Sequence, residues 1–417
     1  MRRTNKPSSR LPYIARRATL KMAAASLAAL VLPRPAGAKD AQATFDQWIA
    51  SFQTKALARG ITAETYARVM NGLKPDPTGL AAIREQPEFN EQLWQYLNRR
   101  VSDWRIISGR LKAQEYAALL ARIERDYGVA PSVMLGVWGV ESTFGDPLVQ
   151  KNHMRPVIPS LATLAWGETR RRGYWESELI NALTIIQNGW STAAEMNGSW
   201  AGAMGHTQWM PEVWLHLGVD YDHDGKISPF GRPDDALATT ARYFVERGNY
   251  RRGEAWGYEV RAPEKAGGKK SRRYAEWQKL GVVRADGKAY PLPDVTAKLW
   301  VPVRDGPAFL LGPNFSAVHT YNPSMNYTLA IVHLGDRCTG GEPFVQSFPG
   351  SEPPPTLAEV QEIQRRLTAL GFNTGGADGR AGTGTMLAVQ AYQRKVGMNP
   401  ADGYAGIKLL ARLRQEP

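Results

Sequence analysis

The chain has 417 residues, of which 43% are hydrophobic and 10% aromatic, so it is long enough for two or three domains and is neither collagen-like, disordered nor a multi-span membrane protein. Its net charge of +13 is concentrated at the start: residues 1–38 hold eight of the 52 Lys and Arg and no acidic residue, which leaves 44 basic against 39 acidic residues, or +5, in the remainder. This balance requires no nucleic-acid partner, and the single cysteine, Cys338, excludes an intramolecular disulfide framework.

Residues 1–38 are predicted to be a cleaved export signal. A basic segment precedes a short apolar run from Met22 to Leu32, and small residues follow it up to Ala38. Because a helix needs about 20 residues to cross a bilayer, cleavage after Ala38 is favoured over the alternative of a retained membrane anchor. The pair Arg16-Arg17 resembles a twin-arginine signal, although ordinary secretion signals also carry arginines. We expect a periplasmic protein with no stable membrane anchor.

Residues 39–338 are expected to form one large, mainly helical domain. Its first part has apolar residues at helical spacing, as at Phe45 and Ile49. Strand-like alternation is scarce before residue 256, and a shorter mixed region follows. The basic run at 263–273 is interpreted as a solvated loop, with a polymer-contacting patch as the alternative. An apolar helix at 325–334 closes the domain.

A second, smaller domain follows a linker. Residues 339–356 are rich in Pro and Gly and are predicted to be that linker. Apolar residues at helical spacing, among them Leu357, Val360 and Leu367, predict the first of three helices in residues 357–413. A unit of this size can fold alone but is too small to hold a deep active site, so it is expected to be a binding module.

The most informative segment is residues 130–145, Ala-Pro-Ser-Val-Met-Leu-Gly-Val-Trp-Gly-Val-Glu-Ser-Thr-Phe-Gly. Pro131 suits the first turn of a helix, and Met134, Trp138 and Glu141 then fall on one face. A carboxylate therefore ends an apolar stripe near the helix C-terminus, where burial and the helix dipole both favour its protonated form. A general acid needs this environment. The alternative is a solvated glutamate at a helix end.

A second segment, residues 197–211, has the sequence Asn-Gly-Ser-Trp-Ala-Gly-Ala-Met-Gly-His-Thr-Gln-Trp-Met-Pro. Its glycines and alanines allow close backbone approach. Ser199 and Gln208 supply hydroxyl and amide groups, and Trp200 and Trp209 supply aromatic faces, which together are typical of a sugar site. A tightly packed helix–turn junction explains the composition equally well.

Together the two segments resemble the membrane-bound lytic murein transglycosylase B family. Further matching motifs follow in the family's order: Gln86-Pro-Glu-Phe89, Ser160-Leu-Ala-Thr-Leu164, Arg170-Arg171 with Tyr174-Trp175, Asp235-Ala-Leu237 with Tyr243-Phe244, and Tyr321-Asn322 with Tyr327. The resemblance implies a mainly α fold with a lysozyme-like helical catalytic domain. It also implies cleavage of the bond between N-acetylmuramic acid and N-acetylglucosamine, with a 1,6-anhydro end formed instead of water addition.

The resemblance also implies roles for individual residues. Glu141 matches the single catalytic acid/base, and Arg170 and Arg171 match residues near the stem peptide, where a cationic fork suits a carboxylate. The matched positions that line the glycan cleft are Ser199, Gln208, Trp209, Tyr243, Tyr321, Asn322 and Tyr327. Two departures concern subsite preference: Trp209 stands where Phe is usual, which preserves an aromatic wall, and His206-Thr207 replaces the usual pair.

One carboxylate suffices for this chemistry. Two-carboxylate glycosidases need a second group as nucleophile or as base for water. Here the 2-acetamido group of the substrate can stabilise the cationic centre and its C6 hydroxyl can attack, with Glu141 first giving and then taking a proton. Asp146 is the nearest other carboxylate, and its position between Gly145 and Pro147 indicates a structural role in a turn.

The segment 220–227, Asp-Tyr-Asp-His-Asp-Gly-Lys-Ile, fits part of a calcium loop. The expected ligands are the side chains of Asp220, Asp222 and Asp224 and the carbonyl of Lys226. The bidentate glutamate of such loops is missing, so Asp234 or Asp235 is expected to close the site, and the family resemblance supports a structural Ca²⁺. The alternative is an acidic turn without metal, and no other cofactor is expected.

Residues 357–413 are similar to the three-helix peptidoglycan-binding domain through their Asp-Gly turns and Gln-Arg helices. Tethered by the linker, this domain is expected to raise the effective concentration of the catalytic domain on the wall. The expected partners are glycan strands, stem peptides and wall-synthesis proteins, and the protein is expected to be a monomer.

Two other functions remain open from the sequence. One is a lysozyme-like muramidase that uses water as the acceptor, for which a second carboxylate in the cleft would be needed. The other is a wall-binding protein without catalytic activity, against which the complete motif around Glu141 argues.

Overall fold

The structure is a computed structural model that describes residues 38–76, 78–80, 91–146, 154–266 and 270–416. The predicted export signal, apart from Ala38, and the Gln86–Phe89 motif lie outside the described residues. Within the described part of the chain, no helix is both long and apolar enough to cross a membrane.

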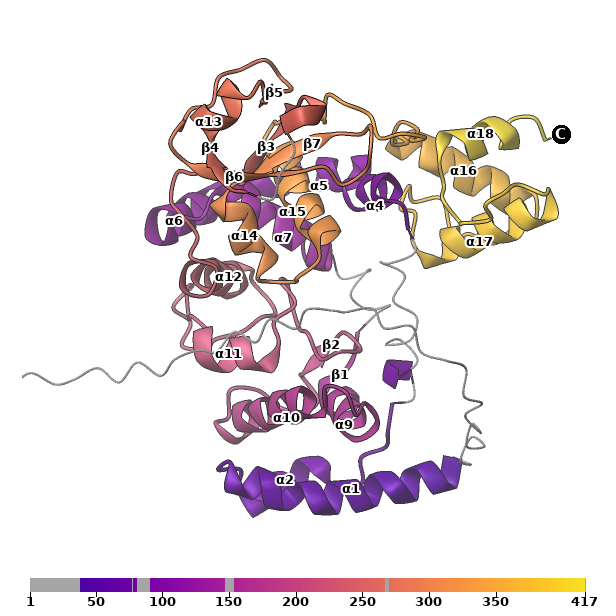
Figure 1. Ribbon diagram of the computed structural model, residues 1–417. Coiled ribbons are helices and arrows are strands. Elements are labelled where there is room, and N and C mark those ends of the chain that lie inside the picture. Colours follow the sequence, from indigo (N-terminus) through magenta and orange to yellow (C-terminus); the bar gives the residue numbers. More distant parts are fainter. Residues whose placement is uncertain (1–37, 77, 81–90, 147–153, 267–269, 417) are drawn as a thin grey trace, which may run out of the picture.

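Two helical cores lie one above the other in Figure 1, with a small sheet above them and the C-terminal helices at the side. The lower core joins segments far apart in sequence, because α1 and α2 pack beneath α9 and α10. Its elements are α1 (Ala38–Ala58), α2 (Ala63–Met70), β1 (Arg155–Pro156), α9 (Val157–Gly167), α10 (Arg172–Gln187), β2 (Asn197–Gly198) and α11 (Pro211–Leu217). Strands β1 and β2 pair antiparallel.

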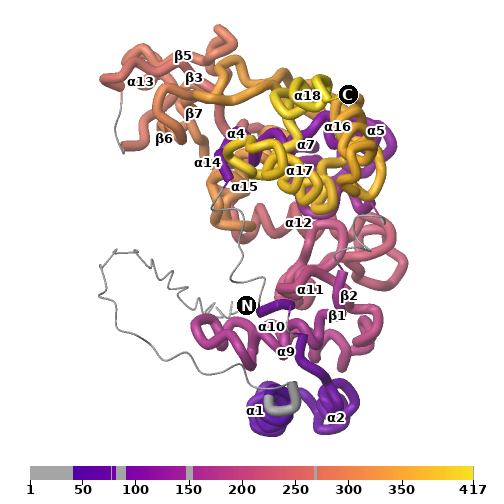
Figure 2. The backbone as a smooth tube through the Cα atoms, turned by 90° about the vertical axis from the view of Figure 1, so that its right-hand side faces the viewer, coloured from indigo at the N-terminus to yellow at the C-terminus, as the bar shows by residue number. Residues whose placement is uncertain are grey.

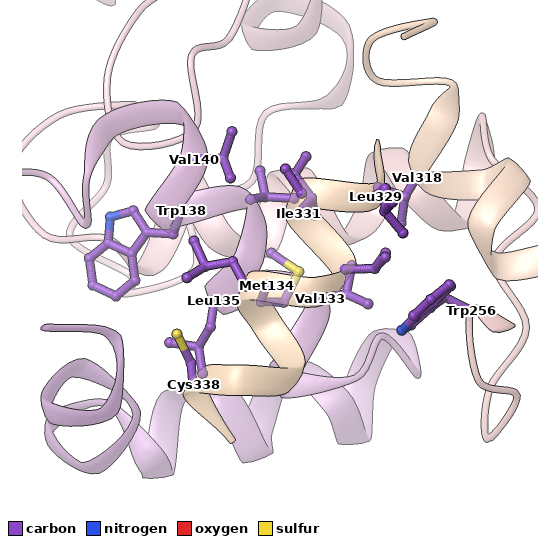
Figure 3. Close-up of a cluster of buried hydrophobic side chains, with 14 of the residues drawn as sticks. Val133, Met134, Leu135, Trp138, Val140, Trp256, Val318, Leu329, Ile331 and Cys338 are labelled. Carbon is purple, nitrogen blue, oxygen red and sulfur yellow. The ribbon is translucent and has the colours of Figure 1, made fainter. Parts of the chain in front are cut away.

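The upper core surrounds helix α7, whose residues are buried on every side except near its ends. Among the described helices, α5, α6, α12 and α15 pack against α7, and α15 makes the most extensive contact. The elements of this core are α4 (Leu93–Arg100), α5 (Asp103–Glu115), α6 (Ala117–Tyr127), α7 (Pro131–Ser142), α12 (Asp234–Glu246), α14 (Pro313–His319) and α15 (Met325–Cys338). Figure 3 shows Met134 and Leu135 of α7 packed between α15 residues such as Ile331 and Cys338.

Glycines allow α7 and α15 to cross at close range. A Cβ atom on Gly136 of α7 would lie 2.1 Å from the carbonyl oxygen of Ile331, and one on Gly335 of α15 would lie 1.9 Å from that of Ser132. Neither helix backbone can shift to make room for a side chain without disrupting its own packing, since both helices are buried. The absence of two side chains therefore fixes the distance between the helices.

A five-stranded antiparallel sheet in the order β4-β6-β7-β3-β5 covers the upper core. Strand β7 lies between β3 and β6, and its residue Leu310 pairs with Tyr258 on one side and with Leu299 on the other. The elements are β3 (Gly257–Arg261), the 3₁₀ turn η2 (Glu264–Ala266), β4 (Arg272–Arg273), α13 (Tyr274–Lys279), β5 (Val283–Arg284), β6 (Thr296–Trp300) and β7 (Ala308–Leu311).

The C-terminal domain consists of α16 (Leu357–Ala369), α17 (Thr383–Lys395) and α18 (Ile407–Leu413) around a small core of its own. A capping box between Thr356 and Glu359 starts α16. The two views agree that this domain lies beside α4 and α5 (Figure 1 and Figure 2). The prediction of a mainly helical chain that ends in three short helices is confirmed.

The segment expected to act as a tether is held against the rest of the molecule. The N–H groups of Val345 and Gln346 donate to the carboxylate of Glu259 at 2.7 and 2.8 Å. The carbonyl of Glu352 accepts a hydrogen bond from Asn98. This segment is therefore not a free chain between two independent domains, because its polar backbone groups find partners on the sheet and on α4.

The close helix crossing predicts that Gly136→Ala destabilises the protein by about 1–3 kcal/mol, the usual effect of overpacking. The added methyl group meets a helix backbone, and this effect outweighs the higher helix propensity of alanine. The matched control is Gly173→Ala in α10, where no described residue beyond the glycine's own stretch of helix comes within 4 Å of the added carbon. Urea unfolding of the two variants checks the prediction, and equal midpoints would contradict it.

Candidate active site

Helix α7 carries Glu141 into a strained turn. The three residues that follow Ser142 all have positive φ angles: 56° at Thr143, 60° at Phe144 and 74° at Gly145. A left-handed conformation is costly for a β-branched or aromatic residue, about 1–3 kcal/mol each. The burial of the Phe144 ring against Trp138 stabilises the turn, with ring centroids 5.8 Å apart. The direction of the chain after Glu141 is thus set by packing.

The half-buried carboxylate of Glu141 accepts a hydrogen bond from the hydroxyl of Tyr327. Tyr327 lies in the first turn of α15, only 4% exposed, and its own N–H is capped by Ser324. Burial, together with the negative charge of Glu141, raises the pKa of Tyr327 well above its usual value. The phenol therefore stays protonated and serves as a permanent donor to the carboxylate.

Two further tyrosines line the same region. The hydroxyl of Tyr321 donates to the carbonyl of Thr207 at 2.6 Å, and its ring meets that of Tyr243 edge-on at 5.1 Å. Tyr243 donates to the carbonyl of Thr320. Burial and the nearby charge of Glu141 also raise the pKa of Tyr321. Asn322 is half-buried in the same α14–α15 connection.

The glycine-rich segment closes on itself beside this region. The N–H and carbonyl groups of Met204 and Trp209 pair with each other at 2.8 Å in both directions. The hydroxyl of Ser199 accepts two backbone N–H groups, and the amide of Gln208, a residue with φ of 55°, donates to Gly205. Both predicted polar groups are therefore half-buried and fixed by local bonds.

The structure corrects the interpretation of Trp209 as an aromatic wall. Its side chain is 1% exposed, lies in the lower core and donates to the hydroxyl of Thr240. The indole supports the segment from beneath and offers no face to a sugar. Trp200, in contrast, is partly exposed.

Arg170 and Arg171 lie on the connection between α9 and α10, two helices of the lower core, whereas Glu141 and Tyr327 belong to the upper core. Both side chains are exposed, and the backbone N–H groups of the two residues donate to the carboxylate of Glu168. The guanidinium of Arg171 stacks over the ring of Trp175 at 4.6 Å.

His206 is a connecting residue that the sequence marked only as a departure from the family. The indole N–H of Trp138 donates to its Nδ1 at 3.1 Å, so its Nε2 carries the proton and lies 2.8 Å from the carbonyl of Gly231. Ser142 donates to its backbone carbonyl at 2.5 Å. A Cβ atom on Gly145 would lie 2.4 Å from its ring. His206 therefore joins the strained turn to the loop that carries the aspartates.

Three of the predicted metal ligands gather together. Carboxylate oxygens of Asp220, Asp222 and Asp235 lie within 4.8 Å of one another, and Asp235 reaches this loop from α12. Oδ1 of Asp220 is buried and has no hydrogen-bond partner in the described part of the chain. Burial and the charge of Asp222 raise the pKa of Asp235. A buried acceptor among three carboxylates fits a hard cation such as Ca²⁺.

The carboxylates of Asp224 and Asp234, also predicted as ligands, are not among these three. The side chain of Asp224 is exposed and accepts the N–H of Lys226 at 2.8 Å, so it lies outside the group of three carboxylates. Lys226 is exposed as well. Asp234, the alternative closing residue, pairs with Arg122 and Arg232.

Comparisons with known proteins agree with this architecture. Residues 44–336 match the transglycosylase SLT domain family, and residues 356–413 match a family of peptidoglycan-binding domains. The structure is similar to that of SltB3 from Pseudomonas aeruginosa in complex with NAG-NAM-pentapeptide, with 38% identity and a TM-score of 0.68 over 89% of this chain and 99% of that chain.

Two Escherichia coli proteins are similar at lower identity. Membrane-bound lytic murein transglycosylase B is 29% identical over 224 residues, an alignment that spans 53% of this chain and 60% of that relative's length. The structure of SLT35 in complex with calcium has the same fold, with 23% identity and a TM-score of 0.60 over 72% of this chain and 93% of that chain.

The environment of His206 predicts that the free energy of unfolding depends on pH through this residue. Burial lowers its pKa below the usual 6.5, and protonation would set an N–H against the indole N–H of Trp138. Between its folded pKa and 6.5 the unfolded state binds more protons, so this histidine's contribution to stability falls as the pH falls through that window.

Urea unfolding of wild type and His206→Gln between about pH 5 and pH 8 checks this prediction. The wild type is expected to lose more stability than the variant below about pH 6.5, and the two curves should run parallel above it. Parallel curves over the whole range would contradict the assignment.

Proposed function

Because the chain belongs to the transglycosylase SLT domain family, we propose that it is a lytic transglycosylase that cleaves the β-1,4 bond between N-acetylmuramic acid and N-acetylglucosamine in peptidoglycan. The products carry 1,6-anhydro-N-acetylmuramic acid ends and serve cell-wall remodelling or turnover. The observation that carries this proposal is the carboxylate of Glu141, which lies at the end of buried helix α7 and is hydrogen-bonded by Tyr327.

The reaction needs one group that gives a proton and then takes one. Protonated Glu141 donates to the glycosidic oxygen as the bond to C1 breaks, and the departing sugar keeps that proton. The 2-acetamido group stabilises the cationic centre. The C6 hydroxyl then bonds to C1 and passes its proton to Glu141, so the carboxyl group returns to its starting state and no water is consumed.

Tyr327 suits both steps because it donates to the carboxylate without supplying a competing base. Its raised pKa keeps it neutral, and its hydrogen bond fixes the orientation of Glu141. The nearest carboxylate along the chain, Asp146, is paired with Arg380 at 2.5 Å. This pairing supports transfer to the substrate's own hydroxyl over activation of water.

We propose that the glycan contacts come from two parts of the chain: Ser199 and Gln208 of the glycine-rich segment, and Tyr243, Tyr321 and Asn322. The hydrogen bond from Tyr321 to Thr207 and its edge-on contact with Tyr243 support this proposal, because they join the tyrosines to the glycine-rich segment. The exposed pair Arg170 and Arg171 is proposed to bind a carboxylate of the stem peptide. SltB3 binds NAG-NAM-pentapeptide, a ligand with both kinds of group.

The proposed site of action is the periplasm, where peptidoglycan is accessible. The export signal predicted in residues 1–38 supports this location, and the C-terminal domain is proposed to bind the wall as its family implies. The protein is proposed to act as a monomer on glycan strands and stem peptides, with wall-synthesis proteins as further partners.

Glu141→Gln is expected to lower turnover at least about a hundredfold, because the amide can neither give nor take the proton. Fold and binding to sacculi should be unchanged. The matched control is Glu124→Gln, an exposed glutamate of α6, which should retain full activity. Release of soluble muropeptides from purified sacculi measures the effect, and an active Glu141→Gln enzyme would refute the role of Glu141.

Mass spectrometry of the wild-type products distinguishes the acceptor. Anhydro muropeptides, lighter than the reducing-end forms by one water, are expected. Reducing-end products that incorporate ¹⁸O from labelled water would mean a hydrolytic muramidase. Binding to sacculi without any product would mean a wall-binding protein.

We further propose that Asp220, Asp222 and Asp235 hold a structural Ca²⁺, with a backbone carbonyl at Lys226 as a further ligand. Oδ1 of Asp220, which has no hydrogen-bond partner among the described residues, supports this proposal. SLT35, a protein of the same fold, has been solved in complex with calcium. The ion would supply positive charge to a loop joined to the strained turn through His206, and no catalytic step involves it.

Calcium is expected to raise the thermal midpoint of the wild type, since a ligand at about 100 times its Kd stabilises the folded state by about 2.7 kcal/mol. Asp220→Asn should abolish that rise. Asp294→Asn, which alters an exposed aspartate outside the acidic cluster, should leave it intact. Thermal melts in calcium and in EDTA check this, and equal melts of the wild type in both would exclude the site.

A further inference from the structure

Two turns of the C-terminal domain, residues 377–382 and 401–406, share the pattern Ala-Asp-Gly-X-Ala-Gly. In the first turn, the side-chain amide of Gln364 donates to the carboxylate of Asp378 at 2.9 Å and accepts the N–H of Gly379 at 2.8 Å. The glutamine therefore clamps the turn from both sides.

The second turn repeats these contacts. Gln393 donates to Asp402 at 3.0 Å and accepts the N–H of Gly403 at 2.9 Å. Gly379 and Gly403, which follow the aspartates, both have a φ of 78°, so the two turns have the same backbone conformation at this point. The residue after each glycine, Arg380 in one turn and Tyr404 in the other, therefore occupies an equivalent position.

Both equivalent residues contact the catalytic part of the chain. The hydroxyl of Tyr404 accepts a hydrogen bond from Asn98 of α4 at 2.9 Å, and its ring meets that of Trp94 edge-on at 5.1 Å. Asp402 accepts a bond from Gln95 of the same helix at 2.7 Å. Figure 2 shows the C-terminal helices over α4 and α5. This turn therefore contacts α4 through both Tyr404 and Asp402.

Arg380 makes a different kind of contact. Its guanidinium pairs with the carboxylate of Asp146 at 2.5 Å and lies over the ring of Trp104 at 4.8 Å. The side chains of Arg380 and Asp146 are 30% and 17% exposed, so the pair is partly sheltered from solvent and is screened less than a surface pair.

Asp146 terminates the strained turn that follows Glu141. Its N–H donates to the carbonyl of Thr143 at 3.3 Å, and the N–H of Gly145 donates to the hydroxyl of Ser142 at 3.0 Å. The turn is held at its start by Ser142 and the buried Phe144 ring. Its far end is held by the ion pair with Arg380.

We propose that Arg380 is a positioning residue for the catalytic carboxylate. By holding Asp146, the C-terminal domain keeps the left-handed turn in place and with it the last turn of α7, which carries Glu141. Through this ion pair, and not through its other contacts, the docked domain sets the turnover rate in addition to binding the wall. This proposal rests on the proposed role of Glu141.

The alternative is that Arg380 only stabilises the interface between the two domains and has no effect on the catalytic carboxylate. The equivalent turn argues against that view, because Tyr404 and Asp402 dock on α4 without reaching the catalytic turn. A variant of Tyr404 therefore serves as the matched control for general loosening of the interface.

The experiment compares Arg380→Gln with Tyr404→Phe on soluble glycan strands, where wall affinity does not contribute. Arg380→Gln is expected to lower kcat about tenfold with KM within about twofold, as a small misplacement of a reacting group does. Arg380→Lys should recover most of the rate, and Tyr404→Phe should match the wild type. Asp146→Asn should lower kcat equally, with no further loss in the double variant.

Hydrogen exchange provides a second readout that does not depend on activity. Exchange in the segment 138–146 should accelerate in Arg380→Gln and not in Tyr404→Phe, with no change elsewhere in the upper core. If the wild type makes no anhydro product, the proposed function fails while this measurement still tests the coupling. The proposal is overturned by unchanged kcat and exchange, by equal losses in both variants, or by a faster Arg380→Gln enzyme.

Discussion

The close crossing of α7 and α15 is the constraint on which the rest of the site depends. Gly136 and Gly335 leave no room for a side chain between the helices, so the two backbones touch. This contact brings Glu141, near the end of one helix, beside Tyr327, near the start of the other. A buried donor and a half-buried carboxylate thus meet although 186 residues separate them in the chain. The helix interface determines the geometry of the proposed proton transfer.

Around this crossing, the turn after Glu141 is a junction for three other parts of the molecule. His206 links it to the glycine-rich segment and, through Gly231, to the acidic loop. Arg380 links it to the C-terminal domain. Residues in left-handed conformations persist only where their surroundings determine them, and here the surroundings come from distant segments. The proposed metal site and the docked C-terminal domain are therefore connected to the same few residues that position the carboxylate.

Much of this arrangement follows from the sequence and some of it does not. The spacing of Met134, Trp138 and Glu141 predicted the helix and its carboxylate, and the pattern of C-terminal apolar residues predicted three helices. Side-chain exposure could not be predicted in the same way. Trp209 was expected to face the sugar, but it is a core residue because the glycine-rich segment folds back over it. The contact between Asp146 and Arg380 joins two domains, and periodicity within a segment carries no information about such pairs.

The most direct test of the account is the effect of Tyr327→Phe on kcat and KM with soluble glycan strands. Removing one hydroxyl keeps the buried ring and deletes only the hydrogen bond to Glu141. The account predicts that kcat falls about tenfold or more while KM and the anhydro product are retained. An unchanged kcat would contradict the claim that the helix crossing positions the catalytic carboxylate through Tyr327.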